Sequence, residues 1–286
     1  MQRPASLNPK HKGPMNKLFS IPAIASLLLA TVAARAGEPV TAVDKTIPPP
    51  EEQYHASRGL ITLQGPSGMF INPTSATLPQ GRFTMQYCLF FPNRDTDVVG
   101  HGTLLAYGIT DWLELGAVGN LIDVNDGADT EFVIGGPMMR VRLLRDREWW
   151  PEVSVGGYVK WGTNALNSST AFIAASKRIP IDPDGFFKSI VVQSGFRHTW
   201  FDEPQGTFRT EGSRRAYGGL ELELPYRIYV VGEWTQKDND TDRRTPFAYG
   251  LQCRLPGVAL TCALLQDGGQ HERIGIYSGI GISFGF

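Results

Sequence analysis

The end of the chain constrains the fold most, because its large apolar residues alternate with small or polar ones. Large apolar residues occupy these even positions: Ile274, Ile276, Ile280, Ile282, Phe284 and Phe286. The odd positions between them hold glycine, serine and tyrosine, with arginine at 273. Such an alternation predicts a β-strand with one apolar face and one small or polar face.

The same alternation recurs in segments of about ten residues from Gly81 onward, the length of a strand that crosses a membrane. Strands are predicted near 81–91, 100–109, 111–121, 131–144, 152–161, 170–178, 188–201, 214–224, 227–235, 245–254, 258–265 and 272–286. No interval has a 3.6-residue apolar period long enough for a helix. The expected fold class is therefore all-β, with about twelve strands.

The connections between these segments alternate in length. Long polar connections are expected at 92–99, 122–130, 162–169, 202–213, 236–244 and 266–271. The other set, at 110–111, 145–150, 225–226 and 256–257, is tight, with 179–187 as a longer member. Transmembrane barrels have long loops on one side of the membrane and short turns on the other. The alternation therefore favours an antiparallel barrel.

Alternation alone leaves two architectures open, because a soluble β-sandwich shows the same pattern with its apolar face inward. Here the face opposite the apolar one is rich in glycine and charge, which suits a polar lumen better than a soluble core. Aromatic residues also fall near predicted strand ends, where girdles meet the membrane surface. We therefore expect a transmembrane antiparallel β-barrel over residues 81–286. The alternative is a secreted soluble β-protein that binds a ligand.

The charged residues on the inferred inner face form the candidate site. They are Arg82, Glu114, Arg140, Arg142, Glu152, Lys160, Arg197, Arg215, Glu221, Glu223, Glu233, Arg254 and Arg273. These charges either set the selectivity of a pore or form an internal network of ion pairs. A barrel of about twelve strands lies between filled eight-stranded barrels and open sixteen-stranded ones. The sequence leaves open whether residues 56–80, rich in Gly, Pro, Ser and Thr, occlude this lumen.

The start of the chain has the features of a secretory signal. Asn16-Lys17 forms a short basic region, residues 18–33 are largely apolar, and Ala34-Arg35-Ala36 has the small-x-small form of a cleavage site. We expect translation to begin at Met15, a signal peptide within 1–36, and a periplasmic linker and lead-in at 37–80. The net charge of −1 and the lack of a basic run give no reason to expect nucleic acid as a partner.

The residues that could carry chemistry are few. His55 and Ser57 have the spacing of an outer-membrane lipid hydrolase, but they fall in the linker, where nothing would hold a catalytic triad. Residues 238–242 resemble the start of a calcium loop without the glycine and glutamate that complete it. We expect no metal, no cofactor and no catalytic residue. Cys253 and Cys262 flank a predicted turn, and they either pair or face lipid as free thiols.

Two segments resemble known proteins. A final strand that ends on an aromatic residue resembles the closing strand of bacterial outer-membrane barrels, which implies that Phe284 and Phe286 belong to the signal read by the barrel assembly machinery. Residues 66–75, followed by Leu78-Pro79-Gln80-Gly81, resemble the start of YjbH-like outer-membrane proteins linked to exopolysaccharide production. Ser75 stands where that family has alanine, and the chain is shorter than its longer members.

These resemblances imply a location in the bacterial outer membrane, in contact with outer-membrane lipid. They imply a non-enzymatic channel or export-associated envelope protein, with polysaccharide or small polar solutes as its partners.

Overall fold

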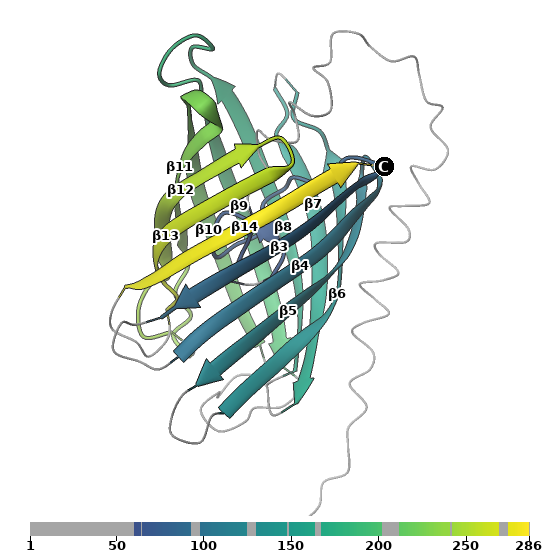
Figure 1. Cartoon of the computed structure of the whole chain (residues 1–286), viewed down its shortest axis with the longest axis vertical. Helices are drawn as coiled ribbons and strands as arrows, with labels where there is room; N and C mark the ends of the chain where they lie inside the picture. The colour runs from purple at the N-terminus through teal and green to yellow at the C-terminus, as the bar shows by residue number, and fades with distance from the viewer. Residues whose placement is uncertain are drawn as a thin grey trace, which may run out of the picture. The chain divides into compact units, whose positions relative to one another are not determined.

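Twelve antiparallel strands close into a barrel in which the last strand pairs with the first strand of the wall (Figure 1). The computed structural model describes residues 60–63, 65–92, 98–124, 130–147, 149–163, 167–201, 212–240, 242–268 and 274–285. The wall strands are β3 (Arg82–Phe91), β4 (Val98–Thr110), β5 (Leu113–Val124), β6 (Thr130–Leu144), β7 (Glu152–Thr163), β8 (Ser168–Pro180), β9 (Ser189–Phe201), β10 (Gly212–Leu224), β11 (Ile228–Thr235), β12 (Phe247–Leu255), β13 (Val258–Gln266) and β14 (Gly275–Gly285). The predicted all-β class and the strand count are confirmed.

The remaining elements are short. Two strands precede the wall, β1 (Leu60–Ile61) and β2 (Ser67–Gly68), and they pair only with each other. A single 3-10 turn, η1 (Pro225–Arg227), joins β10 to β11. No helix among the described residues is long and apolar enough to cross a membrane.

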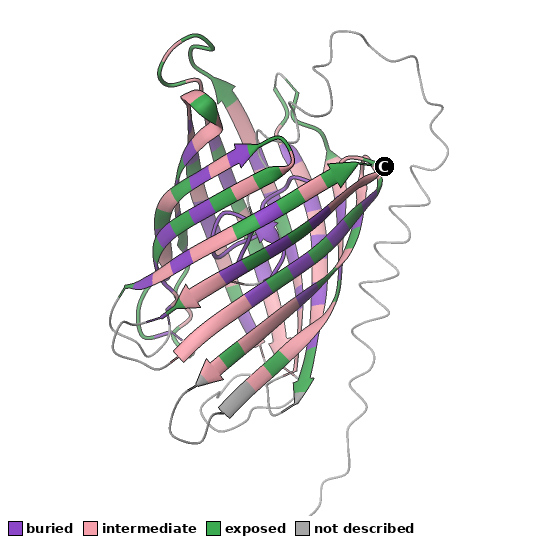
Figure 2. Cartoon of the chain, viewed as in Figure 1, coloured by how far each residue is buried: buried purple, intermediate pink, exposed green. Residues whose placement is uncertain are grey.

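The outer face of the wall is apolar along its middle. On β12, Leu251 is 53 % exposed, whereas the next residue, Gln252, is 1 % exposed. A similar alternation appears on the other wall strands, seen in Figure 2 as bands of exposed and buried residues, with local breaks such as Arg140 and Val141, which are both buried on β6. A soluble monomer rarely exposes a continuous apolar surface of more than a few hundred Å². The orientation with apolar residues outward, expected for a transmembrane barrel, is confirmed.

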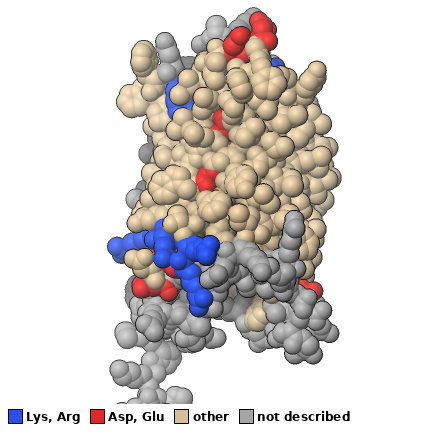
Figure 3. Space-filling view, turned by 90° about the vertical axis from the view of Figure 1, so that its left-hand side faces the viewer, with Lys and Arg blue, Asp and Glu red and all other residues tan. Residues whose placement is uncertain are grey.

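Charged side chains collect at the two ends of the barrel. On the face shown in Figure 3, Lys and Arg gather at the lower edge and Asp and Glu at both edges, with few charges between them. One end holds the turns after β4, β6, β8, β10 and β12, and we call it the turn end. The opposite end holds the six remaining connections, and we call it the loop end. This arrangement matches the alternation predicted for the connections.

The lumen is occupied by the chain itself. We call residues 61–80, of which Gln64 is outside the described residues, the plug. Its apolar side chains Ile61, Met69, Phe70, Ile71 and Leu78 are almost completely buried. They pack against inward-facing wall residues that include Leu104, Met138, Phe172, Val231, Leu265 and Tyr277. The plug appears in Figure 2 as a buried segment inside the barrel.

This core differs from the polar lumen expected from the sequence. Glycine and charge do line much of the wall, but apolar residues such as Leu104 and Val231 interrupt them on the same face. These residues lie inside the barrel because the plug offers them an apolar surface to bury. The lumen is therefore a mixed interior, apolar where plug side chains meet the wall and polar elsewhere.

Close packing between plug and wall depends on glycine at two wall positions. A Cβ on Gly108 would lie 2.0 Å from the carbonyl oxygen of Pro79. A Cβ on Gly219 would lie 2.3 Å from the sulfur of Met69. Glycine at these positions lets the plug lie directly against the wall.

Candidate functional site

Glu233 on β11 accepts four hydrogen bonds from the plug. Its Oε1 accepts hydrogen bonds from the backbone N–H groups of Phe70 at 2.7 Å and Ile71 at 2.5 Å. Its Oε2 accepts from the backbone N–H of Asn72 at 3.2 Å and from Asn72 Nδ2 at 3.0 Å. Consecutive N–H groups that converge on one anion form a nest, a recurrent way of binding negative charge. Here the anion in the nest is a carboxylate of the barrel wall.

Arg140 on β6 binds the plug in the opposite sense, through backbone carbonyl groups. Its guanidinium donates to the carbonyl oxygen of Ser67 at 2.9 Å, to Ser67 Oγ at 3.3 Å, and to the carbonyl oxygen of Ala76. The side chain is fully buried. One arginine thereby joins two plug residues that are nine positions apart, and it fixes the path of the segment between them.

Further polar contacts extend along the plug. Glu114 Oε2 accepts from the N–H of Leu78 at 2.8 Å, and Gln252 Nε2 donates to the carbonyl of Met69 at 2.8 Å. The hydroxyl of Tyr277 donates to the carbonyl of Ile61, and the hydroxyls of Ser75 and Ser176 are in contact. Residues from β5, β8, β12 and β14 therefore all hold the plug, which excludes attachment at one side only.

A second group of predicted lumen residues pairs within the wall. Arg254 Nη1 lies 2.6 Å from Glu221 Oε2, and Arg142 Nη1 lies 3.8 Å from Glu152 Oε1. Glu223 binds Arg178 and accepts from Ser189 Oγ at 2.6 Å. Opposite charges that are buried together satisfy each other, as an internal network requires.

The charged residues expected in the lumen thus have several environments. The fully or almost fully buried ones are Glu114, Arg140, Glu152, Lys160, Arg197, Glu221, Glu223, Glu233 and Arg254. Arg82, Arg142 and Arg215 are partly buried, and Arg273 lies outside the described residues. The side chains of Glu114, Arg140 and Glu233 and the backbone N–H of Arg82 form hydrogen bonds with the plug.

Near the loop end, Arg215 on β10 pairs with Asp242 at 2.8 Å. Asp242 also accepts from the N–H of Asp238 at 3.0 Å. Burial raises the pKa of the Asp242 carboxyl, although the Asp238 N–H and the Arg215 guanidinium act against that shift. The 238–242 segment, whose sequence resembles the start of a calcium loop, is therefore tied to the wall by a charge pair.

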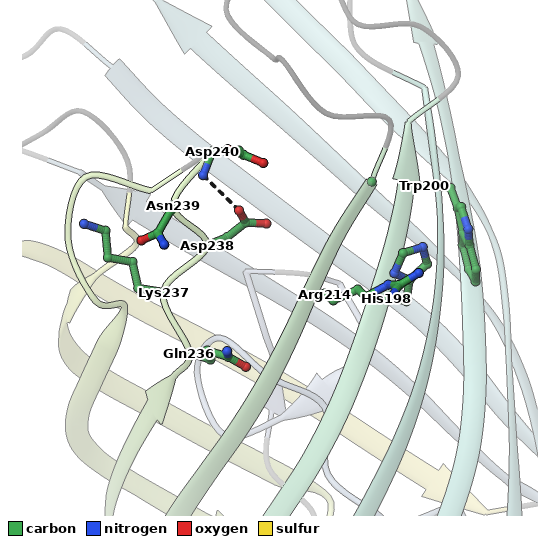
Figure 4. A pocket seen from close by; sticks show the side chains of 9 residues that line it. His198, Trp200, Arg214, Gln236, Lys237, Asp238, Asn239 and Asp240 are labelled. Atoms are coloured by element: carbon green, nitrogen blue, oxygen red, sulfur yellow. Dashed lines mark hydrogen bonds between the residues drawn. The ribbon is translucent and has the colours of Figure 1, made fainter.

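A pocket of about 700 Å³ lies beside this connection at the loop end (Figure 4). It is lined by His198, Trp200, Gly212, Arg214, Gln236, Lys237, Asp238, Asn239 and Asp240. Asp238 Oδ1 accepts from the N–H of Asp240 at 3.0 Å, the contact drawn in Figure 4. Two basic and two acidic side chains balance each other around this pocket, so its charge favours an ion of neither sign.

The outward-facing residues include several that the sequence singles out. Phe284 is exposed and lies ring to ring with Phe83 at 5.2 Å, whereas Phe286 lies outside the described residues. His198 packs edge-on against Trp200 at 4.1 Å. Cys253 and Cys262 are both free thiols, because Cys253 stands opposite Leu260 and Cys262 opposite Leu251. The possible disulfide is therefore absent.

Two further expectations from the sequence concern a hydrolase pair and a metal site. His55 and Ser57, the candidate hydrolase pair, lie outside the described residues, as does the signal region. Within the described ranges, no three His, Cys, Asp or Glu side chains gather closely enough to hold a metal ion.

The plug's own binding residues and several of their wall partners could not be named from the sequence. Asn72, Gln252, Ser176 and Tyr277 all contact across the lumen. Asn72 lies in the 66–75 segment that resembles YjbH-like proteins, but nothing in that motif indicates a contact with the wall. The signal that could have found Gln252 is its position on the small or polar face of its strand.

Comparison with known proteins finds solved barrels of similar form. No family model and no curated protein sequence matches the chain. A KdgM porin is 8 % identical and matches with a TM-score of 0.49 over 70 % of this chain and 99 % of that chain. The translocator domain of the autotransporter NalP from Neisseria meningitidis is 14 % identical, with a TM-score of 0.42 over 72 % of this chain and 88 % of that chain. These scores are too low to carry an argument, and the fold assignment rests on the closed strand pairing.

Proposed function

We propose that the chain is a non-enzymatic channel of the bacterial outer membrane whose lumen is closed by its own plug. The observation that carries this proposal is the way in which the plug is held. Side chains of the wall bind its backbone N–H and carbonyl groups through Glu233, Arg140, Glu114 and Gln252. Water can replace these hydrogen bonds when the plug leaves, but release also exposes buried apolar side chains of the plug such as Phe70 and Leu78, so the closed state is favoured.

The apolar outer face and the unequal ends support a location in the outer membrane. In outer-membrane barrels the long loops face outside and the short turns face the periplasm. In that orientation the loop end of this barrel faces the exterior, and the first residue of β3 pairs with the last residue of β14 at the periplasmic side. Membrane fractionation and heat-modifiable mobility on gels would test both the location and the barrel.

The resemblance to YjbH-like proteins supports polysaccharide, or another polar solute, as the cargo. Residues 66–75 carry that resemblance, and they include Ser67, Met69 and Asn72, which bind the wall. If the resemblance is functional, the family motif is the part of the chain that closes the lumen.

Conductance in planar bilayers tests the proposal. The full chain is expected to give small or rare openings, and variants that weaken the plug are expected to give larger or more frequent ones. A barrel that conducts in neither form would be a structural envelope protein and would contradict the channel assignment.

A further inference from the structure

Lys160 on β7 and Arg197 on β9 lie on the lumen side of the wall, toward the loop end. Each is near the end of its strand, at Thr163 and Phe201 respectively. Lys160 is 6 % exposed and Arg197 is 4 % exposed. One strand, β8, separates them. Tyr158, Thr170 and Thr199 pair across β7, β8 and β9, and the two basic residues are each two positions from this row.

Neither cation has a carboxylate partner in the described part of the chain. Lys160 Nζ donates to the neutral Asn120 Oδ1 at 2.7 Å and lies 5.3 Å from the centre of the Tyr158 ring. Arg197 Nη1 is buried and has no hydrogen-bond partner among the described residues. The guanidinium is therefore short of at least one acceptor.

Three other arginines of the wall have their charge matched. Arg254 pairs with Glu221, Arg142 with Glu152, and Arg215 with Asp242. Glu233, another buried carboxylate of the lumen, accepts hydrogen bonds from the plug through both of its oxygens. Lys160 and Arg197 are thus left without a carboxylate partner among the described residues.

Two buried cations that lack a carboxylate partner are costly unless a negative charge joins them. We propose that Lys160 and Arg197 form a binding site for an oxyanion, the carboxylate or sulfate group of an acidic solute that enters from the loop end. A guanidinium offers such a group two parallel N–H donors, and an ammonium adds a compact point charge. The hydroxyls of Thr170 on β8 and Thr199 on β9 are 2.9 Å apart and share one hydrogen bond, which leaves at most one O–H of the pair to donate.

This inference deepens the proposed function, because it names acidic solutes as the class that the lumen selects. It rests on that function only in requiring access from the loop end. Binding is measured without current flow, so failure of the site and failure of the channel give different results.

The test is equilibrium binding to the full-length protein in detergent, with sulfate, glucuronate and glucose as three separate probes. Sulfate and glucuronate are expected to bind saturably and to compete with each other, whereas glucose does not bind. Arg197→Gln and Lys160→Met are each expected to weaken binding at least tenfold. Arg142→Gln, on a lumen arginine that is paired with Glu152, is the matched control and is expected to leave binding unchanged.

Heat-modifiable mobility checks that each variant folds, and Arg197→Lys, which keeps the charge, is expected to retain binding within a few-fold. Binding of sulfate without glucuronate assigns the site to a free inorganic anion, and binding of both extends it to acidic sugars. No saturable binding of either anion, or equal binding by folded Arg197→Gln, overturns the site. Conduction without anion binding would leave the channel intact and remove the site alone.

Discussion

Glu233 on the barrel wall holds Asn72 of the plug twice, through the backbone N–H at 3.2 Å and through Nδ2 at 3.0 Å, both to the same carboxylate oxygen. The two residues are 161 positions apart in the chain. Asn72 Nδ2 also donates to Thr235 Oγ1 at 2.7 Å, so β11 binds this part of the plug at two neighbouring inward positions. The strand that holds the plug here, β11, is therefore far along the sequence from β3, the strand that directly follows the plug.

Glu233→Gln is expected to loosen the plug. The amide keeps the size of the side chain, but it replaces one acceptor oxygen with an NH₂ group that faces backbone N–H groups. The loss of a hydrogen bond to a charged group costs about 1.5–3 kcal/mol. The fraction of barrels with a released plug should therefore rise roughly ten- to 150-fold, seen as more frequent openings in planar bilayers.

The matched control for this variant is Glu223→Gln, which removes a lumen carboxylate bound to Arg178 and Ser189. Its openings should match those of the unaltered chain. Equal opening frequencies in Glu233→Gln and Glu223→Gln would mean that Glu233 does not hold the plug in place.

Gly108→Ala is expected to displace the end of the plug from the wall. The added Cβ would lie 2.0 Å from the Pro79 carbonyl oxygen, which belongs to the backbone and cannot rotate away. Overpacking of this kind costs about 1–3 kcal/mol. Faster cleavage of the plug by an added protease is the readout. Gly232→Ala, whose Cβ meets nothing within 4 Å, is the control, and equal cleavage of both variants would argue against close docking at Gly108.

The strands could be predicted from the sequence because each carries its own pattern. For example, the alternation of apolar Leu251 with polar Gln252 predicts that the first faces outward and the second inward, and their exposed fractions agree with this. The predicted strand at 258–265 corresponds to β13, and predicted and observed boundaries differ by up to three residues in either direction. β5, for example, ends at Val124 where the pattern predicts 121, and β12 begins at Phe247 where it predicts 245. Strand ends vary because ladder pairing, and not the apolar alternation, sets where each strand stops.

The plug could not be predicted in the same way. Its path depends on Glu233, Arg140 and Glu114, which are each distant in sequence and become neighbours only when the barrel closes. The charge pattern of the wall is the same for an open pore and for a plugged one. The apolar residues Leu104 and Val231 on the inner face do indicate a plug, because an open aqueous lumen would leave them exposed to water.

Ile280→Lys is expected to destabilise the barrel because the side chain faces outward at the middle of β14. A lysine facing lipid at the bilayer midplane costs about 2–4 kcal/mol, and the cost falls toward zero near the membrane surface. Ile181→Lys, also on an exposed isoleucine but in the β8–β9 connection, is the matched control. Urea unfolding in lipid vesicles measures the free energy of unfolding of each variant. A similar decrease of that free energy in the two variants would contradict the membrane orientation assigned to β14.

Arg140→Met is expected to free the middle of the plug without opening the wall. The variant removes the donors to the Ser67 and Ala76 carbonyls while retaining much of the side-chain volume. Hydrogen exchange at residues 67–76 should then quicken, while exchange in β6 and β7 stays slow because their ladder is intact. Unchanged exchange in the plug would show that Arg140 does not hold it in place.

The central claim is that the plug closes the conducting path, and a reversible tether tests it most directly. The hydroxyls of Ser75 on the plug and Ser176 on β8 are in contact, so Ser75→Cys with Ser176→Cys places two thiols at that position. The pair is made in a Glu233→Gln chain whose Cys88, Cys253 and Cys262 are replaced by alanine. Single-channel conductance is then recorded before and after reduction. The account predicts a closed barrel when the pair is oxidised and frequent openings when it is reduced, whereas the same current in both states would contradict it.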